Sequence, residues 1–325
     1  MSSQGDQYSL GIDLGGTTFS VGVFDGEGRL VDRGSYDTPV GASPDALVSA
    51  LERGVRQHGE KAAGGIGSLV GVAIGFPGPV DPDAGVVKQA PNIRGLGGFP
   101  LTRTLGDRLG GIPVHLQNDA YCATLAELRW GAGKEADNLL MFTLGTGVGG
   151  GVAMNNRVIR GPRQILGEVG HIVIEPNGRK CGCGNFGCLE AMAAKQAIID
   201  MAARAIQSGR PTLLNDLTGG SQCRLTPQVV TEACEAGDAA AIDVYQRAGY
   251  YIGLALCNCI VLCDPDLIVI GGGIAAAGKF IFDPIKRTVA ARSLISGFDV
   301  QNIVPARFGN DAGVYGAGAL AWEQA

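Results

Sequence analysis

Residues 10–24 read LGIDLGGTTFSVGVF, which is a short apolar run, a glycine-rich turn and a second apolar run. We expect a strand over Leu10–Leu14, a turn over Gly15–Thr18 and a returning strand over Phe19–Phe24. A second turn at Asp25–Gly28 precedes a third apolar run. This stretch therefore predicts a meander of antiparallel hairpins and not a strand followed by a helix.

A similar pattern recurs later in the chain. An apolar strand over Asn138–Leu144 enters a glycine-rich loop over Gly145–Gly151, and the chain returns through Val152–Met154. Leu14-Gly15-Gly16-Thr17 and Leu144-Gly145-Thr146-Gly147 hold equivalent places. A duplication into two related halves and a chance likeness of glycine-rich hairpins both account for these residues.

Further segments alternate between strand and helix patterns, and the chain after Leu189 is mostly helical. The expected elements are a helix over Pro44–Gln57, a strand over Leu69–Phe76, a strand over Pro113–Gln117, a helix over Ala120–Trp130 and a strand over Asp266–Ile270.

The composition excludes several classes of protein. The 325 residues include 53 glycines without a three-residue period and only 15 prolines, so the chain is not collagen-like. An apolar content of 46% is sufficient for a core, and the length predicts two domains. A net charge of −5 argues against nucleic-acid binding. The sequence shows no signal peptide and no membrane span, and its nine cysteines suit a reduced, cytoplasmic setting.

Three glycine-rich turns each follow an apolar strand. In such turns backbone N–H groups can point at phosphate oxygens, and nearby threonine hydroxyls can add hydrogen bonds. Asp13 is placed to hold a phosphate-bound Mg²⁺ through water. A single turn of this kind is more often only structural, but three beside Asp13 favour a nucleotide. The turns are Gly15-Gly16-Thr17-Thr18, the loop that includes Thr146 and Gly147, and Gly271-Gly272-Gly273.

Other nucleotide-binding folds fit less well. The P-loop pattern and the protein-kinase signatures are absent from the sequence. Gly145, Gly147 and Gly150 match the dinucleotide pattern G-x-G-x-x-G, but they lead into an apolar strand and not into a helix. A dehydrogenase is therefore the weaker interpretation.

Two further groups of polar residues can carry chemistry. Asn118-Asp119 ends a strand and opens a helix, where Asp119 could accept a proton, although helix capping explains the spacing better. His171, Cys181, Cys183 and Cys188 can form a closed tetrahedral zinc site. With four protein ligands such a site has no position open for substrate, so we interpret the metal as structural.

These motifs resemble those of the ROK family of sugar kinases and sugar-responsive repressors, over nearly the whole chain. The most specific of them lie in the zinc-binding segment. The matching residues are DLGGT at 13–17, FPGPVD at 76–81, NDA at 118–120, LGTGVGGG at 144–151, EVGH at 168–171, CGCG at 181–184 and GCLE at 187–190.

The resemblance implies an α/β protein with the actin-like ATPase (ribonuclease H-like) fold, in which two domains enclose ATP and sugar in the cleft between them. We expect a small domain over residues 1–119, completed by a C-terminal helix over 312–325. We expect a large domain with the zinc-binding segment over residues 120–311.

The resemblance also implies roles for single residues. Asp119 matches the general base that takes the proton from the sugar 6-hydroxyl, and His171 is implied to bind both zinc and sugar. Implied sugar ligands are Gly78, Asn92, Asn118, Asp119, Glu168, His171 and Glu190. Implied nucleotide-binding residues are Asp13, Gly15, Gly16, Thr17, Thr18, Thr146, Gly147, Gly271, Gly272 and Gly273.

The implied activity is ATP-dependent phosphorylation of a hexose, with D-glucose as the first expectation. Kinases for N-acetylglucosamine, N-acetylmannosamine or fructose remain open, as do polyphosphate as the donor and a non-catalytic sugar sensor. The implied cofactors are Mg²⁺ and structural Zn²⁺, and the implied assembly is a homodimer or homotetramer. Repressor members carry an N-terminal helix-turn-helix domain, which the residues before the first strand do not contain, so we expect no DNA binding.

Overall fold

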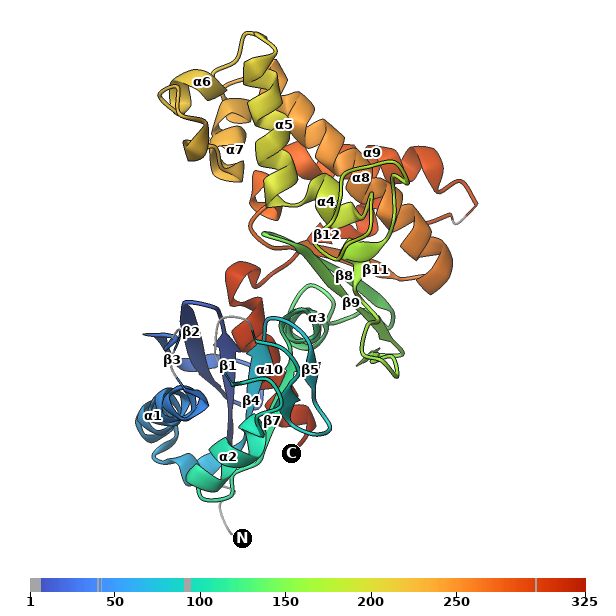
Figure 1. The fold of residues 1–325 in the computed structure, drawn as a ribbon. Coiled ribbons are helices and arrows are strands. Elements are labelled where there is room, and N and C mark those ends of the chain that lie inside the picture. The colour runs from blue at the N-terminus through green and yellow to red at the C-terminus, as the bar shows by residue number, and fades with distance from the viewer. Residues whose placement is uncertain (1–6, 40, 42, 91–94, 296) are drawn as a thin grey trace. The chain divides into compact units, whose positions relative to one another are not determined.

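A computed structural model describes residues 7–39, 41, 43–90, 95–295 and 297–325 (Figure 1). The chain forms two compact units, each with its own sheet. Unit 1 consists of Met1–Lys134 and Asn310–Ala325, and unit 2 consists of Glu135–Gly309. Among the described helices, none combines the length and apolar character needed to cross a bilayer.

Unit 1 contains a five-stranded sheet in the order β3-β2-β1-β4-β7. The first three strands form the expected antiparallel meander, and β4 and β7 extend it in parallel. A small hairpin, β5 and β6, follows β4. The strands are β1 (Tyr8–Leu14), β2 (Thr18–Phe24), β3 (Leu30–Asp37), β4 (Leu69–Phe76), β5 (Val80–Asp81), β6 (Val86–Val87) and β7 (Val114–Asn118).

Helices cover both faces of this sheet, and alternate side chains of β1 contact the helices on opposite faces. Leu10, Ile12 and Leu14 are fully buried in an apolar core with residues of α1 and α2. Gly11 and Asp13 point to the other face, where α10 packs against β1. A Cβ atom at Gly11 would lie 2.3 Å from the carbonyl oxygen of Val314, so only glycine allows this approach. The helices are α1 (Pro44–Ala63), α2 (Leu101–Arg108), α3 (Asp119–Trp130) and α10 (Ala312–Glu323).

The helix expected over Pro44–Gln57 continues for six more residues, to Ala63. It begins where the Ser43 side chain accepts a hydrogen bond from the backbone of Ala46, with Pro44 in its first turn. It ends only at Gly64, which adopts the left-handed conformation with φ 69°. An end at Gln57, as expected from the apolar pattern, is therefore six residues too early, because the signal that ends the helix is Gly64.

Unit 2 repeats the topology of unit 1. Its sheet has the order β10-β9-β8-β11-β12, again three antiparallel strands followed by two parallel ones. A backbone hydrogen bond closes the first turn in each unit, from Gly15 N–H to Thr18 O and from Gly145 N–H to Gly147 O, both at 2.9 Å, and the second of these turns is one residue shorter. This agreement favours the duplication over chance likeness. The strands are β8 (Leu139–Leu144), β9 (Val148–Met154), β10 (Arg157–Val158), β11 (Leu267–Gly271) and β12 (Ile303–Pro305).

The core of unit 2 is built around α8 and α9. Gly249 and Gly253 of α8 lie against Pro284 and Thr288 of α9, where a Cβ atom would come within 2.6 Å of the neighbouring side chain. Cys259 of α8 is buried and contributes its thiol to this core. The helices are α4 (Leu189–Ala193), α5 (Lys195–Gln207), α6 (Leu214–Leu217), α7 (Pro227–Glu235), α8 (Ala239–Cys263) and α9 (Lys279–Arg292).

Two details differ from the sequence expectations. The glycine-rich loop expected over Gly145–Gly151 is a short turn, since Val148–Met154 is strand β9. Gly150 lies inside that strand, where a Cβ atom would meet Met141 O at 2.4 Å, so its lack of a side chain serves packing. The expected domain boundary at Asp119 falls at the start of α3, whereas the contacts of unit 1 continue to Lys134 because α3 packs closely against α10.

Candidate active site

In unit 1, several of the predicted site residues lie at one edge of the sheet. The parallel strands β1, β4 and β7 end side by side, because Asp13 pairs with Gly75 and Phe76 pairs with Asn118. The carboxyl ends of parallel strands are the usual place for ligands in open α/β sheets. Gly78 follows β4 with φ 122°, and its carbonyl oxygen accepts a hydrogen bond from Asn118 Nδ2 at 3.3 Å. Gly78 and Asn118 are thus brought together.

Asn118 and Asp119 connect β7 to α3. The Asn118 side chain caps the helix, because its Oδ1 atom accepts hydrogen bonds from the backbone of Ala120 at 2.9 Å and of Tyr121 at 3.2 Å. The capping role expected from the spacing is therefore confirmed for Asn118. Asp119 is the first residue of α3 and is half-buried, so its carboxylate sits at the positive end of the helix dipole.

Asp13 is a carboxylate in an unfavourable environment. Burial, followed by the nearby charges of Asp119 and Asp311, raises its pKa from 3.8 to about 6. The side chain also lies against the start of α10, since a Cβ atom at Gly313 would come within 2.5 Å of its carboxyl carbon. A cation beside these three acids would relieve their repulsion, which fits the prediction that Asp13 holds Mg²⁺.

The turn after β1 is open to solvent. Gly16, Thr17 and Thr18 are exposed, and the turn is closed by the bond from Gly15 N–H to Thr18 O. Gly15 is required there, because a Cβ atom would lie 2.6 Å from Thr18 O. The geometry therefore leaves both threonine side chains accessible at the edge that also carries Asp13.

In unit 2, the two predicted nucleotide turns lie at the ends of neighbouring strands. Gly271 pairs with Thr143, so the turn after β11 lies beside the turn after β8, which contains Thr146 and Gly147. Gly272 has φ 85°, and a Cβ atom on it would meet Leu144 O at 2.3 Å. Gly271 itself is buried in β11, whereas Gly273 is exposed. Of these three glycines, Gly271 thus serves strand packing.

Glu168 and His171 are held against β9 by glycines. A Cβ atom at Gly170 would meet Val148 O at 2.1 Å, and one at Gly167 would meet Gly150 O at 2.7 Å. His171 N–H donates to Glu168 O at 3.0 Å within a single turn of 3₁₀ helix. Both side chains are exposed, on a backbone segment that packs closely against β9.

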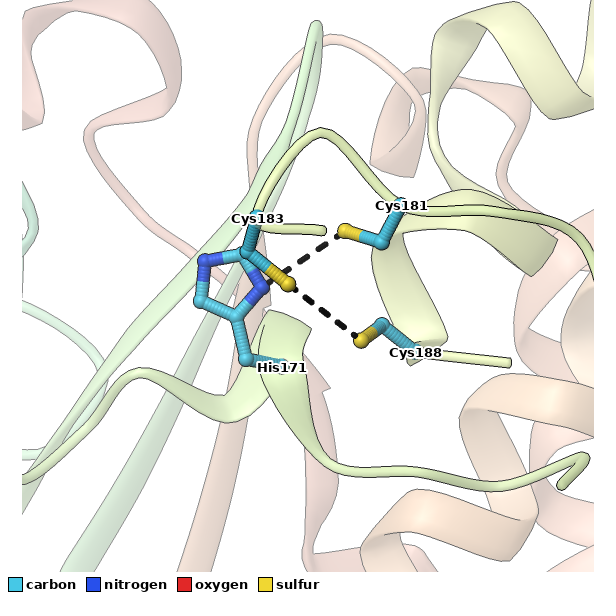
Figure 2. Close-up of side chains that lie close together, drawn as sticks. All are labelled: His171, Cys181, Cys183 and Cys188. Atoms are coloured by element: carbon cyan, nitrogen blue, oxygen red, sulfur yellow. Dashed lines mark hydrogen bonds between the residues drawn. The ribbon is translucent and has the colours of Figure 1, made fainter. Parts of the chain in front are cut away.

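The four residues predicted to bind zinc converge (Figure 2). Their candidate ligand atoms all lie within 4.8 Å of one another. The sulfur atoms of Cys183 and Cys188 are 3.7 Å apart, and His171 Nδ1 lies 3.7 Å from the sulfur of Cys181. Bond lengths of a tetrahedral zinc site imply ligand separations of about 3.6–3.8 Å. These two separations match that value, and one imidazole with three thiols is a donor set that suits Zn²⁺.

The protonation of the thiols also bears on metal binding. Burial, with the neighbouring thiols, raises the pKa of Cys188 to about 12. The Asn185 backbone amide and the Cys181 thiol lower the pKa of Cys183. A metal that binds these thiolates must release protons, so its affinity rises with pH.

Glu190 connects the zinc cluster to the turn after β8. Its Oε2 atom accepts a hydrogen bond from Val148 N–H at 3.1 Å and lies 2.4 Å from the place of a Cβ atom at Gly147. Its Oε1 atom lies 3.7 Å from the sulfur of Cys181. The half-buried carboxylate is thus fixed by one backbone amide and borders both the cluster and the turn.

Asn92, one of the implied sugar ligands, lies outside the described residues.

Asp311 is a site residue that the sequence did not indicate. Its charge helps to raise the pKa of Asp13, and its carboxylate pairs with Arg33 at 3.2 Å. It lies nearly 300 residues from Asp13 in the chain, and no motif connects the two. Only the packing of α10 against β1 brings them together.

The whole chain matches one protein family. The model of the ROK family covers residues 9–324. The chain belongs to the ROK family. As a ROK member it has the actin-like ATPase fold, with two α/β units whose β-sheets have matching topology.

ROK relatives of known name match over nearly their full length. The glucokinase of Halalkalibacterium halodurans is 35% identical over 98% of this chain and 96% of its own. The glucokinase of Thermotoga maritima is 33% identical, with 97% of each chain covered. A crystal structure of a ROK family glucokinase from Streptomyces griseus, in complex with glucose and AMPPNP, has a TM-score of 0.80 at 33% identity, covering 97% of this chain and 99% of its own.

Proposed function

We propose that this protein is a glucokinase, which transfers the γ-phosphoryl group of ATP to the 6-hydroxyl of D-glucose. The observation that carries the proposal is the match to glucokinases at 33–35% identity over almost the whole chain. The geometry at the sheet edge of unit 1 supports it, because an acid, a capped helix start and a glycine-rich turn lie there together.

In this proposal Asp119 is the general base. Its carboxylate takes the proton of the sugar 6-hydroxyl while that oxygen attacks the γ-phosphorus. The bond from this phosphorus to the bridging oxygen breaks, and ADP leaves with the bonding electrons. Asn118 and Gly78 bind the sugar, and Asn92 is proposed to do the same. The cap made by Asn118 fixes the start of α3, so it orients Asp119 as well.

The nucleotide is assigned to three turns. The turn of unit 1 contains Gly15, Gly16, Thr17 and Thr18. The two turns of unit 2 contain Thr146 and Gly147, and Gly272 and Gly273, because Gly271 itself is buried in β11. Their backbone N–H groups and hydroxyls suit phosphate oxygens. Asp13 is proposed to hold Mg²⁺ through water, and this ion supplies charge neutralisation of the phosphates when bound.

Unit 2 is proposed to supply the remaining sugar ligands and the structural metal. Glu168, Glu190 and His171 suit a polyhydroxyl ligand, because carboxylates accept and an imidazole can donate hydrogen bonds. His171 Nδ1 faces the thiols, so its Nε2 atom is left for the sugar. Zn²⁺ bound by His171, Cys181, Cys183 and Cys188 would hold this segment in place.

Several broader properties belong to the same proposal. We infer a cytoplasmic homo-oligomer, a dimer or a tetramer, that does not bind nucleic acid. All nine cysteines are free, which suits a reducing compartment. We also infer two domains in which α3 belongs to the first, so that the boundary lies after α3 and not at Asp119.

A coupled assay of ADP release tests the proposal. The sugars are glucose, fructose, mannose, N-acetylglucosamine and N-acetylmannosamine, with ATP or polyphosphate as the donor. We expect the highest kcat/KM with glucose and ATP. The variant Asp119→Asn should lose about 10²- to 10⁴-fold in kcat and still bind glucose. Asp107→Asn, an exposed position on α2, is the control. Full activity of Asp119→Asn, or no turnover of any sugar, would refute the kinase assignment.

A further inference from the structure

Thr38 stands directly after β3 and is only 5% exposed. It makes two hydrogen bonds to the glycine-rich turn after β1. Its hydroxyl donates to the carbonyl oxygen of Gly15 at 2.9 Å, and its backbone N–H donates to the carbonyl oxygen of Thr17 at 2.8 Å. The pairing of Thr18 with Asp37 brings Thr38 to this position. One buried residue thus holds two carbonyl groups of the turn.

These bonds fix the direction of the neighbouring amides. A trans peptide is planar, so its C=O and N–H groups point in opposite directions. Since the Gly15 carbonyl points at Thr38, the Gly16 N–H points away from Thr38. This amide has no acceptor within the described part of the chain. In the peptide that joins Thr17 to Thr18, the Thr17 carbonyl likewise points at Thr38, so the Thr18 N–H points away from Thr38.

The turn needs such a restraint because it contains two glycines. Glycine has no Cβ atom, so the peptide between Gly15 and Gly16 can rotate at little steric cost. A rotated peptide would present a carbonyl oxygen, with its partial negative charge, where an N–H group now points. A phosphate binds N–H groups and is repelled by carbonyl oxygens.

We propose that Thr38 is a positioning residue for the nucleotide, which keeps the amides of the Gly15–Thr18 turn directed at the phosphates of ATP. This inference rests on the proposed kinase function and on the assignment of the turn to the nucleotide. Thr38 itself does not contact the nucleotide and acts through the backbone of the turn.

The test uses Thr38→Val, which keeps the backbone N–H bond and removes the hydroxyl, and Thr38→Ser, which restores the hydroxyl. Steady-state kinetics give kcat and the two KM values, and calorimetry gives the affinity for AMPPNP. We expect Thr38→Val to raise KM for ATP and Kd for AMPPNP about two- to ten-fold, the effect of one hydrogen bond. KM for glucose should not change, and Thr38→Ser should restore most of the ATP affinity.

The control is Thr218→Val in unit 2, because Thr218 is also a buried threonine whose hydroxyl donates to a backbone carbonyl, that of Leu214 at 2.8 Å. It should leave both KM values unchanged. An unchanged KM for ATP in Thr38→Val overturns the inference, as does an equal rise of both KM values or a failure of Thr38→Ser to restore ATP affinity. If Thr38→Val does not fold, Thr38→Ala is measured by the same criteria.

Failure of the kinase assignment gives a different result. In that case the wild-type protein turns over no sugar, and the affinity for AMPPNP alone decides the role of Thr38. A wild-type protein that turns over glucose but whose Thr38→Val variant binds AMPPNP normally would refute only the role of Thr38.

Discussion

The variant Asp13→Asn should stabilise the ligand-free protein at neutral pH. Burial and the charges of Asp119 and Asp311 raise the pKa of Asp13 from 3.8 to about 6. In the unfolded chain the carboxyl ionises near 3.8, so the folded state holds its proton more tightly. The free energy of unfolding therefore falls as the pH rises from about 3.8, and this loss levels off above about 6.

The size of the effect follows from the two pKa values. Ionisation of Asp13 lowers the free energy of unfolding by about 3 kcal/mol at pH 7.5 and by about 1.6 kcal/mol at pH 5. Asparagine has nearly the same shape and no charge, so it removes this cost. The stability advantage of Asp13→Asn should thus grow by about 1.4 kcal/mol between pH 5 and pH 7.5.

Urea denaturation followed by tryptophan fluorescence measures this difference. The chain has two tryptophans, Trp130 in α3 and Trp322 in α10, so the signal reports on unit 1. Asp107→Asn, at an exposed position of the same unit, should show no such dependence on pH. The reasoning is refuted if Asp13→Asn is less stable than the wild type at pH 7.5, or if its advantage does not depend on pH.

Two other changes should have distinct effects. Purified wild-type protein should contain one equivalent of zinc by elemental analysis, and Cys183→Ser should lose most of it. Cys223→Ser, an exposed thiol outside the cluster, should retain it; equal zinc contents in both variants would argue against the site. Gly316→Ala should destabilise unit 1 by at least about 2 kcal/mol in the urea assay, because overpacking forces α3 and α10 apart. A Cβ atom there would lie 1.7 Å from Cys122 O, whereas Gly67→Ala meets nothing within 4 Å and should change little.

The meander of each unit could be predicted from local patterns. Alternating apolar residues and glycine turns indicate hairpins within about 25 residues, and β1, β2, β8 and β11 appear close to where they were expected. The cluster of His171, Cys181, Cys183 and Cys188 was also predictable, since four residues that can bind a metal lie within 18 positions of one another. Their convergence in the structure agrees with the pattern.

Other features depend on residues far apart in the chain. β12 is only three residues long and pairs with β11, so it carries no pattern of its own. Gly150 and Gly271 are indistinguishable in sequence from the turn glycines beside them, but strand packing buries them. Thr38 has no motif, and only the pairing of β2 with β3 places its hydroxyl on the turn.

The sequence by itself determined the family, the repeated hairpins and the kinds of residue available for chemistry, because these depend on local spacing and residue type. Only the tertiary structure decided which glycines border the candidate site and which serve packing. It alone also placed Asp311 beside Asp13, Thr38 behind the glycine turn and Glu190 between the turn and the thiols. These contacts join distant segments, so they arise only when the helices pack against the sheet and the strands pair.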